Sequence, residues 1–154
     1  KGKSHVMRII RELIFYKAED QKTDISQAIE FVQKVVKRKS VIFLLSDYLD
    51  SSFHKPLCHL NNRHDVVSIK FDDPSELHIP NLGMIKIHDS ENQNSVWVDT
   101  SSNTIRNIMK TSILDADKTL KQFFNKNKID FIPINTSNGY IEPLVSFFTH
   151  RTSN

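Results

Sequence analysis

The sequence predicts an α/β fold: a Rossmann-like open sheet that is mainly parallel, with helices on both faces and a β-hairpin insertion. Three observations favour this fold. Apolar residues recur at helical spacing early in the chain, and two short apolar runs, at 41–45 and 66–71, have the composition of buried strands. A short helical pattern separates those two runs, and two strands joined by a helix favour a right-handed parallel crossover.

Two amphipathic helices are expected before the first strand. The first is expected to end near Lys17, where a polar break begins that extends to Lys22. Its apolar positions are Val6, Ile9, Ile10, Leu13 and Ile14. The second helix ends in the basic residues 37–39, which suit the negative end of a helix dipole. Its apolar stripe is predicted to comprise Ile25, Ala28, Ile29, Val32, Val35 and Val36.

The run 41–45 is followed at once by Ser46 and Asp47. We expect a buried strand that delivers Asp47 to the crevice outside the carboxyl ends of the sheet, where ligands bind in open α/β folds. The spacing of Phe53, Leu57 and Leu60 then predicts a short helix. The second buried strand follows at 66–71.

The middle of the chain predicts a β-hairpin. Asp72, Asp73 and Pro74 end the second strand. The segments 84–88 and 95–99 alternate in hydrophobicity and flank a polar turn at 89–94. Within the hairpin, Trp97 could pack in a core or contact a partner.

A long helix, a short strand and a closing helix complete the prediction. Ser101 or Ser102 can cap the long helix. The final strand, 131–135, contains Pro133, which favours a sheet edge or a strand end. A helix is expected from residue 140 to residue 148. The apolar face of the long helix comprises Ile105, Ile108, Met109, Ile113, Ala116, Leu120, Phe123 and Phe124.

Composition excludes several classes of protein. The 154 residues, of which 38% are hydrophobic and 25% charged, suit a single globular domain. The 21 Lys and Arg residues are interleaved with 18 acids, so nucleic-acid binding is not expected. No apolar run approaches the ~20 residues of a membrane span, and residues 1–5 begin no signal peptide. The single cysteine, Cys58, suits a reducing compartment, and we expect a cytoplasmic protein.

Five blocks occur in a particular order along the chain: HVMRIIREL at 5–13, TDI at 23–25, VIFLLSD at 41–47, RHDVV at 63–67 and VDT at 98–100. In this order they resemble the von Willebrand factor A-like family of uncharacterised bacterial proteins, whose members are typically encoded beside MoxR-type AAA+ ATPases. The resemblance extends to PLVSFF at 143–148, and therefore covers nearly the whole chain.

The resemblance implies an adhesion-type site in which three loops hold a divalent cation. The first loop is Asp-x-Ser-x-Ser, the second supplies a threonine and the third an aspartate; Thr23 matches the second and Asp47 the third. No Asp-x-Ser-x-Ser occurs in the sequence. Residues 1–154 therefore resemble a single, partial domain that lacks its N-terminal strands. Because Mg²⁺ wants about six oxygen ligands, we expect an incomplete site that binds Mg²⁺ or Mn²⁺ in a full-length protein but not tightly in this chain.

The function that the resemblance implies is a non-enzymatic protein-interaction module with a MoxR-like AAA+ ATPase as partner. The alternative is a Mg²⁺-dependent hydrolase or nuclease that uses Asp47, Asp50, Asp72 and Asp73. No Asp-x-Asp follows the first strand, no histidine lies in its loop, and no glycine-rich phosphate loop precedes a helix. We therefore favour the interaction module and do not expect an enzyme.

Local interpretations compete with the metal site. Thr23 or Asp24 could serve only as the N-cap of the second helix, and Asp50 is expected to be solvated. His54 and Cys58 share one helical face at four-residue spacing, but no third transition-metal ligand converges on them. We expect Cys58 to be a packing residue.

The strand at 41–45 also bears on assembly. In the family the matching strand lies beside the strand that carries the first metal loop, so loss of that neighbour would open an apolar edge. No lysine or proline lies between Val41 and Leu45 to block pairing. We expect either a homodimer through this edge or a longer protein that covers it.

Overall fold

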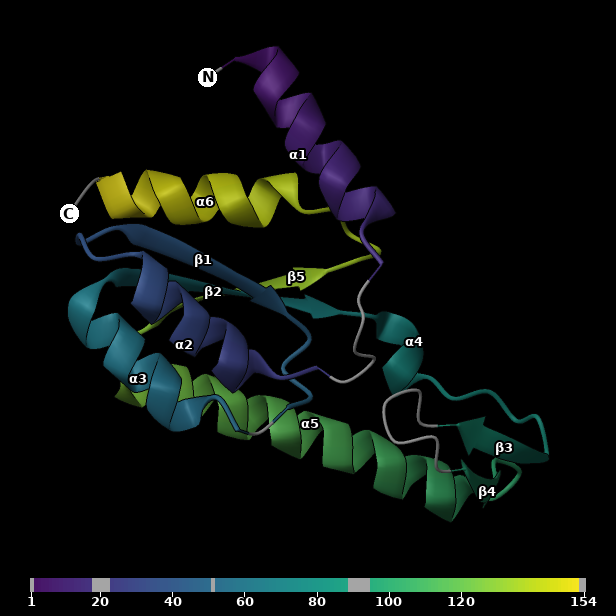
Figure 1. Ribbon diagram of the computed structural model, residues 1–154. Helices are drawn as coiled ribbons and strands as arrows, with labels where there is room; N and C mark the ends of the chain where they lie inside the picture. Colours follow the sequence, from purple (N-terminus) through teal and green to yellow (C-terminus); the bar gives the residue numbers. More distant parts are fainter. Residues whose placement is uncertain (1, 18–22, 51, 89–94, 153–154) are drawn as a thin grey trace.

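The computed structural model describes residues 2–17, 23–50, 52–88 and 95–152. The predicted polar break at 18–22 and the hairpin turn at 89–94 lie outside the described residues. The elements in chain order are α1 (Lys3–Phe15), α2 (Ile25–Val35), β1 (Val41–Ser46), α3 (His54–Arg63), β2 (Asp65–Asp72), α4 (Pro74–Leu77), β3 (Met84–His88), β4 (Ser95–Asp99), α5 (Asn103–Lys126), β5 (Asp130–Asn135) and α6 (Ile141–Thr152), as Figure 1 shows.

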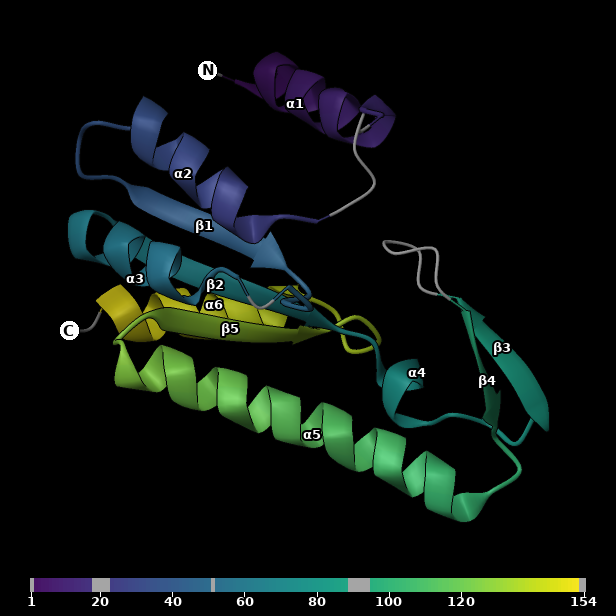
Figure 2. The same ribbon diagram turned by 60° about the horizontal axis from the view of Figure 1, so that its bottom comes forward.

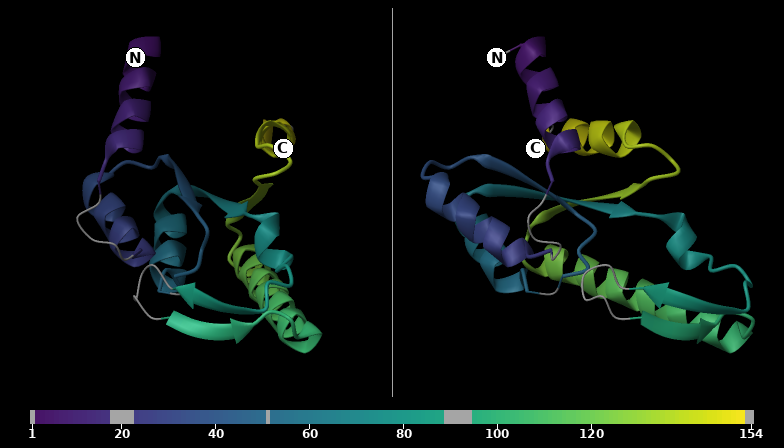
Figure 3. Two further views of the ribbon diagram at one scale, coloured as in Figure 1. Left: turned by 90° about the vertical axis from the view of Figure 1, so that its right-hand side faces the viewer. Right: turned by 45° about the vertical axis from the view of Figure 1, so that its right-hand side comes forward.

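The main sheet has three parallel strands in the order β1-β2-β5. Helices α2, α3 and α5 lie on one face, here called the inner face, and α6 lies on the other, the outer face (Figures 1 and 3). Strands β3 and β4 form a separate antiparallel hairpin. The α/β fold with a mainly parallel sheet, helices on both faces and a hairpin insertion is confirmed.

The inner face carries the larger core. Tyr48 packs edge-on against Phe53 and Phe124, with ring centroids 5.2 and 5.4 Å apart, and Phe124 stacks on Phe131 of β5 at 4.6 Å. Aromatic rings in such arrangements add to the free energy gained by removing their area from water. The buried members of this cluster are Ile25, Ile29, Tyr48, Phe53, Leu57, Leu60, Val66, Leu120, Phe124 and Ile129.

The outer face is covered over β2 and β5 but not over β1. Leu144 and Phe147 of α6 pack on Val67, Ile69, Ile132 and Ile134. The predicted strand at 66–71 is therefore buried over most of its length, although Phe71 at its end is 38% exposed.

The prediction that 41–45 is a buried strand is wrong for three of its five side chains. Val41, Phe43 and Leu45, which point to the outer face, are 53%, 45% and 56% exposed, whereas Ile42 and Leu44 pack on the inner core. Among the described residues β1 pairs with β2 alone. Within the described ranges one edge of β1 is thus open, and on its outer face the ring of Phe148 from α6 lies 6.0 Å from that of Phe43.

Helix α1 forms as predicted, but its apolar stripe is not buried. None of its residues is buried, and Leu13 is 74% exposed. Helix α2 likewise buries only Ile25 and Ile29 of its predicted stripe, while Ala28 and Val35 are exposed. Among the described residues, no helix has both the length and the apolar character to cross a membrane.

The hairpin and the start of α5 are held together by Thr100. This fully buried residue donates its hydroxyl to the Gly83 carbonyl at 2.7 Å and accepts from the Leu82 amide at 3.0 Å. Of the two predicted caps, Ser102 is the N-cap of α5. The hairpin lies beside the first turns of α5, away from the three-stranded sheet (Figure 2), and Trp97 is 64% exposed.

At the other end of the sheet, α6 is fixed by one arginine. Arg151 pairs with Asp65, which begins β2, and with Asp130, which begins β5, the latter at 3.2 Å. The guanidinium also lies 5.5 Å from the centre of the Phe147 ring. The last turns of α6 are therefore held at the amino ends of these strands. Strand β5 is an edge strand with Pro133 exposed, as predicted.

Candidate functional site

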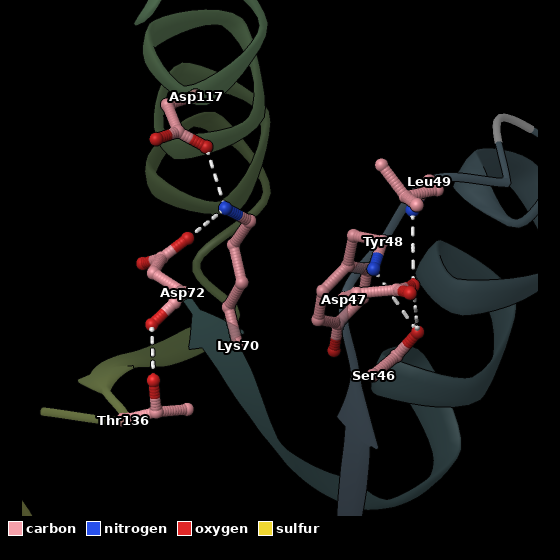
Figure 4. Close-up of polar contacts among 8 residues, drawn as sticks. All are labelled: Ser46, Asp47, Tyr48, Leu49, Lys70, Asp72, Asp117 and Thr136. Carbon is pink, nitrogen blue, oxygen red and sulfur yellow. Dashed lines mark hydrogen bonds and ion pairs between the residues drawn. The ribbon is translucent and has the colours of Figure 1, made fainter. Parts of the chain in front are cut away.

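A tight turn after β1 positions Asp47. The next residue, Tyr48, has a φ of 59°, a left-handed conformation that non-glycine residues rarely adopt. The Ser46 hydroxyl accepts the Tyr48 amide at 3.0 Å, and the Asp47 carboxylate accepts the Leu49 amide at 3.2 Å (Figure 4). These side chains replace backbone partners and hold the turn, and Asp47 remains exposed at the carboxyl end of the sheet.

Tyr48 anchors this turn to the inner core. Its ring is buried between Phe53 and Phe124, and its hydroxyl donates to the Leu44 carbonyl at 3.3 Å. Burial raises the pKa of Tyr48 to about 12, against a smaller opposite effect of the Ser68 hydroxyl. The left-handed turn is thus stabilised by packing as well as by hydrogen bonds.

Asp50 links the turn to the start of α2. Its carboxylate accepts the Ile25 amide at 2.9 Å, and the Ser52 amide and hydroxyl both at 2.7 Å. Burial alone raises the pKa of Asp50, but these hydrogen bonds and the nearby His54 outweigh it and hold that pKa below its usual value. Asp50 is half-buried and not only solvated, because one of its oxygens satisfies the Ile25 amide at the start of α2, which has no partner within the helix.

The two predicted metal-binding residues lie on the two loops that Asp50 connects. Asp24 is the N-cap of α2 and accepts the Gln27 amide at 2.8 Å, which is the local role considered for it. Thr23 precedes it and is exposed. No hydrogen bond joins Thr23 to Asp47 in the described part of the chain, and a cation shared by them stays a prediction. Two side chains do not complete the coordination shell of Mg²⁺, which contains about six oxygen ligands.

A half-buried ion-pair cluster lies at the carboxyl end of β2. The Lys70 ammonium contacts Asp72 and lies 2.6 Å from a carboxylate oxygen of Asp117 on α5 (Figure 4). Burial lowers the pKa of Lys70, but the hydrogen bonds and charges of the two carboxylates outweigh it and raise that pKa. The Asp72 carbonyl also accepts the Thr136 amide at 3.0 Å. Asp72 is thus part of a link between β2, β5 and α5.

Asp73, the fourth acid of the hydrolase alternative, caps α4. Its carboxylate accepts the Ser75 amide at 2.8 Å, and the hydrogen bonds from Ser75 hold the pKa of Asp73 below its usual value. Of the four acids in that alternative, Asp47 and Asp50 border the same cavity, whereas Asp72 and Asp73 serve the structure around α4 and α5.

A cavity of about 460 Å³ opens beside the Asp47 turn, between the ends of β1 and β2 and the middle of α5. Its walls are largely apolar, and five carboxylates border it: those of Asp47, Asp50, Glu76, Asp115 and Asp117. The other described lining residues are Tyr48, Leu49, Phe53, His54, Lys70, Phe71, Ile113, Ala116, Thr119 and Leu120. Apolar concave sites with a few polar groups are where proteins usually bind ligands.

His54 and Cys58 lie on α3, as the helical spacing requires. The His54 ring stacks on Phe53 with centroids 4.4 Å apart and meets Phe123 edge-on at 4.5 Å. Cys58 is half-buried. Within the described ranges, no three or more His, Cys, Asp or Glu side chains are grouped so that they could hold a metal ion.

Sequence reasoning missed Tyr48, Lys70 and the acids of α4 and α5. For Lys70 a signal was present, because a lysine near the end of an otherwise buried run needs a partner when folded. For Asp115 and Asp117 there was none, since acids on an amphipathic helix usually face water.

Comparisons with known proteins place residues 1–119 in a family described as "Protein of unknown function DUF58". Uncharacterized protein MAV169 of Mycobacterium avium is 28% identical over 69 residues, which are 44% of this chain and 41% of that protein. Uncharacterized protein Rv1480 of Mycobacterium tuberculosis has the same identity over the same length, which is 22% of that protein. The chain thus matches less than half the length of these relatives. No solved structure matches. Because the family model covers most of its residues, this chain belongs to the DUF58 family.

Proposed function

We propose that this chain is a non-enzymatic protein-interaction module whose contact site is the cavity beside the Asp47 turn. The main support for this proposal is the cavity itself, which has apolar walls and charged groups at the carboxyl ends of parallel strands. Its border is rigid, because Tyr48 anchors one side and the Lys70 cluster another. A concave site on a rigid border favours binding with little loss of conformational entropy.

We further propose that the module corresponds to the C-terminal part of a von Willebrand factor A-like domain, and that its partner is a MoxR-like AAA+ ATPase. The order of the sequence blocks supports the first proposal. The parallel order β1-β2-β5, with an open edge at β1, is compatible with a domain that continues beyond that edge. The proposal of a MoxR-like ATPase as partner is based on the sequence resemblance alone.

The hydrolase or nuclease alternative has less support. Metal-assisted hydrolysis needs carboxylates that converge on the metals and on an attacking water. Two of its four acids are engaged elsewhere, Asp72 with Lys70 and Asp73 with the start of α4.

Calorimetry with a MoxR-like AAA+ ATPase from the same organism tests the proposed function. The substitution Ala116→Phe places a ring in the cavity, and we expect it to weaken binding at least tenfold. Ala28→Phe is the matched control, because Ala28 is also an exposed helical alanine but does not line the cavity. Equal affinities of the Ala116→Phe variant and the unmodified chain, or no binding by the unmodified chain, would contradict the proposal.

A titration with MgCl₂ tests the proposed remnant of the metal site. We expect at most weak binding, because Thr23 and Asp47 supply two of about six ligands. A tight stoichiometric site that disappears in Asp47→Ala would contradict this expectation.

A further inference from the structure

We infer that the cavity beside the Asp47 turn takes a cationic, amphipathic segment of the partner, with an arginine or lysine side chain inserted between its carboxylates. This inference rests on the proposed function and specifies the chemistry of the same site. It follows from the charges on the border, the elements that carry them and the walls between them.

The charge of the cavity is opposite to that of the chain. The chain as a whole has a net charge of +3, yet its described cavity residues include five carboxylates and one lysine, Lys70. Lys70 adds little positive field at the opening, because Asp117 and Asp72 both contact its ammonium. A local negative field on a basic protein favours a cation at that place.

The exposed carboxylates of the cavity come from three different elements. Asp47 lies in the turn after β1, Glu76 on α4 and Asp115 on α5, and all three are exposed. Asp50 and Asp117, in contrast, are half-buried and accept short hydrogen bonds from Ser52 and Lys70, whereas the hydrogen bond that Asp47 accepts from the Leu49 amide, at 3.2 Å, involves one carboxylate oxygen. Acids spread over three elements suit an extended side chain with several donors, and a guanidinium has five N–H donors.

The walls suit the rest of such a ligand. Phe53, Phe71, Ile113 and Leu120 contribute apolar surface between the carboxylates. The methylene stems of arginine and lysine bury along apolar surface while their charged ends reach polar groups. The volume of about 460 Å³ lies within the range of ligand sites, roughly 300–1,000 Å³.

The test uses the full chain and two synthetic decapeptides, one that alternates arginine with leucine and one with glutamate in place of arginine. Binding is measured by calorimetry, and the site is located by backbone amide shifts in NMR spectra. We expect the arginine peptide to bind, with shifts at Leu49 and Ile113, and the glutamate peptide not to bind. The net charge of the chain favours the glutamate peptide, so a preference for arginine reports the cavity.

Removal of the charges tests the three carboxylates. Each neutralised carboxylate is expected to weaken arginine-peptide binding about two- to fivefold, and the triple variant Asp47→Asn, Glu76→Gln, Asp115→Asn about tenfold or more. The matched control is Glu12→Gln, Glu30→Gln, Glu142→Gln, which removes three exposed acids that do not line the cavity. The control variant is expected to bind like the unmodified chain.

Three outcomes would overturn the inference: equal binding of the two peptides, an equal loss in the two triple variants, or MgCl₂ alone producing the same amide shifts and displacing the peptide. Failure of the inference is distinguishable from failure of the proposed function. Suppose that the ATPase binds, that Ala116→Phe abolishes binding and that the charge-neutralised triple variant binds normally. The cavity is then the interaction site, but its ligand is not a cationic segment.

Discussion

The two faces of the sheet differ most at β1. On the inner face, Ile42 and Leu44 pack against a core that contains Phe53 and Phe124, both almost fully buried. On the outer face, Val41, Phe43 and Leu45 are about half exposed. The buried cluster under α6 comprises residues of β2 and β5, and Phe148 of α6 lies against the ring of Phe43.

The difference shows that the sequence of a strand does not determine its burial. Both sets of β1 side chains are equally apolar, and only the elements packed over them differ. Substitutions on the two faces should therefore have very different effects on the free energy of unfolding.

The largest effect is expected for Phe124→Ala on the inner face. Its ring contacts Tyr48, Phe123 and Phe131, and its removal leaves a cavity in the core. The free energy of unfolding should fall by about 3–5 kcal/mol. Urea denaturation followed by circular dichroism measures the loss. Phe43→Ala on the outer face is the matched control and should cost less than about 1 kcal/mol; similar losses in the two variants would remove the contrast between the faces.

The second effect concerns Tyr48 at high pH. Because burial raises the pKa of Tyr48 to about 12 from the ordinary 10.0, the folded state holds a proton that the unfolded state loses first. This contribution to the free energy of unfolding is fully present below pH 10 and is lost as the pH rises through 12, by roughly 3 kcal/mol in total. Denaturation between pH 9 and 12 measures it. Tyr48→Phe keeps the ring and should remove this part of the pH dependence; identical curves for the two chains would contradict the assignment.

The third effect tests what attaches α2 to the inner face. Asp50→Ala removes the acceptor for the Ile25 amide and for Ser52, and should lower the free energy of unfolding by about 1–2 kcal/mol. Since the pKa of Asp50 is held below its usual value, its contribution is present above the ordinary range of aspartate and is lost as the pH falls through its folded-state pKa. Acid denaturation compares the two chains, and Glu30→Ala is a control at an exposed acid of α2. If the free energy of unfolding falls equally with decreasing pH in Asp50→Ala and in the unmodified chain, this role of Asp50 is contradicted.

The smallest effect on stability is expected for Phe43→Lys. The side chain is already half exposed, so the free energy of unfolding should change by less than about 0.5 kcal/mol. Its expected effect is on association, because lysine blocks pairing at strand edges. We expect the unmodified chain to form dimers in sedimentation experiments and the variant to be monomeric. Dimers of unchanged affinity would show that this edge is not the interface.

Much of the fold was predictable because its signals are local. The helical spacing of α2, α3 and α5, the caps at Asp24 and Ser102, and the paired runs of the hairpin each depend on residues a few positions apart. The exposure of β1 and of α1 was not predictable, since it depends on which distant segments cover them.

The candidate site was predictable in part for the same reason. Asp47 follows an apolar run, and its place at the end of a parallel strand follows from that pattern. Asp50 was assigned to solvent because its partner, the amide of Ile25, lies 25 residues away. Glu76 of α4 follows β2 closely, whereas Asp115 and Asp117 of α5 reach the cavity only after the chain has passed through the hairpin.

The ion pairs of Arg151 have a practical consequence for studying the molecule. They hold the last turns of α6 at the amino ends of β2 and β5, whereas the cavity opens at the opposite, carboxyl ends. A sensor surface or fluorophore coupled beyond α6 would therefore hold the molecule by its far end. The cavity would face the solution, so immobilised chains could report binding without steric interference from their attachment.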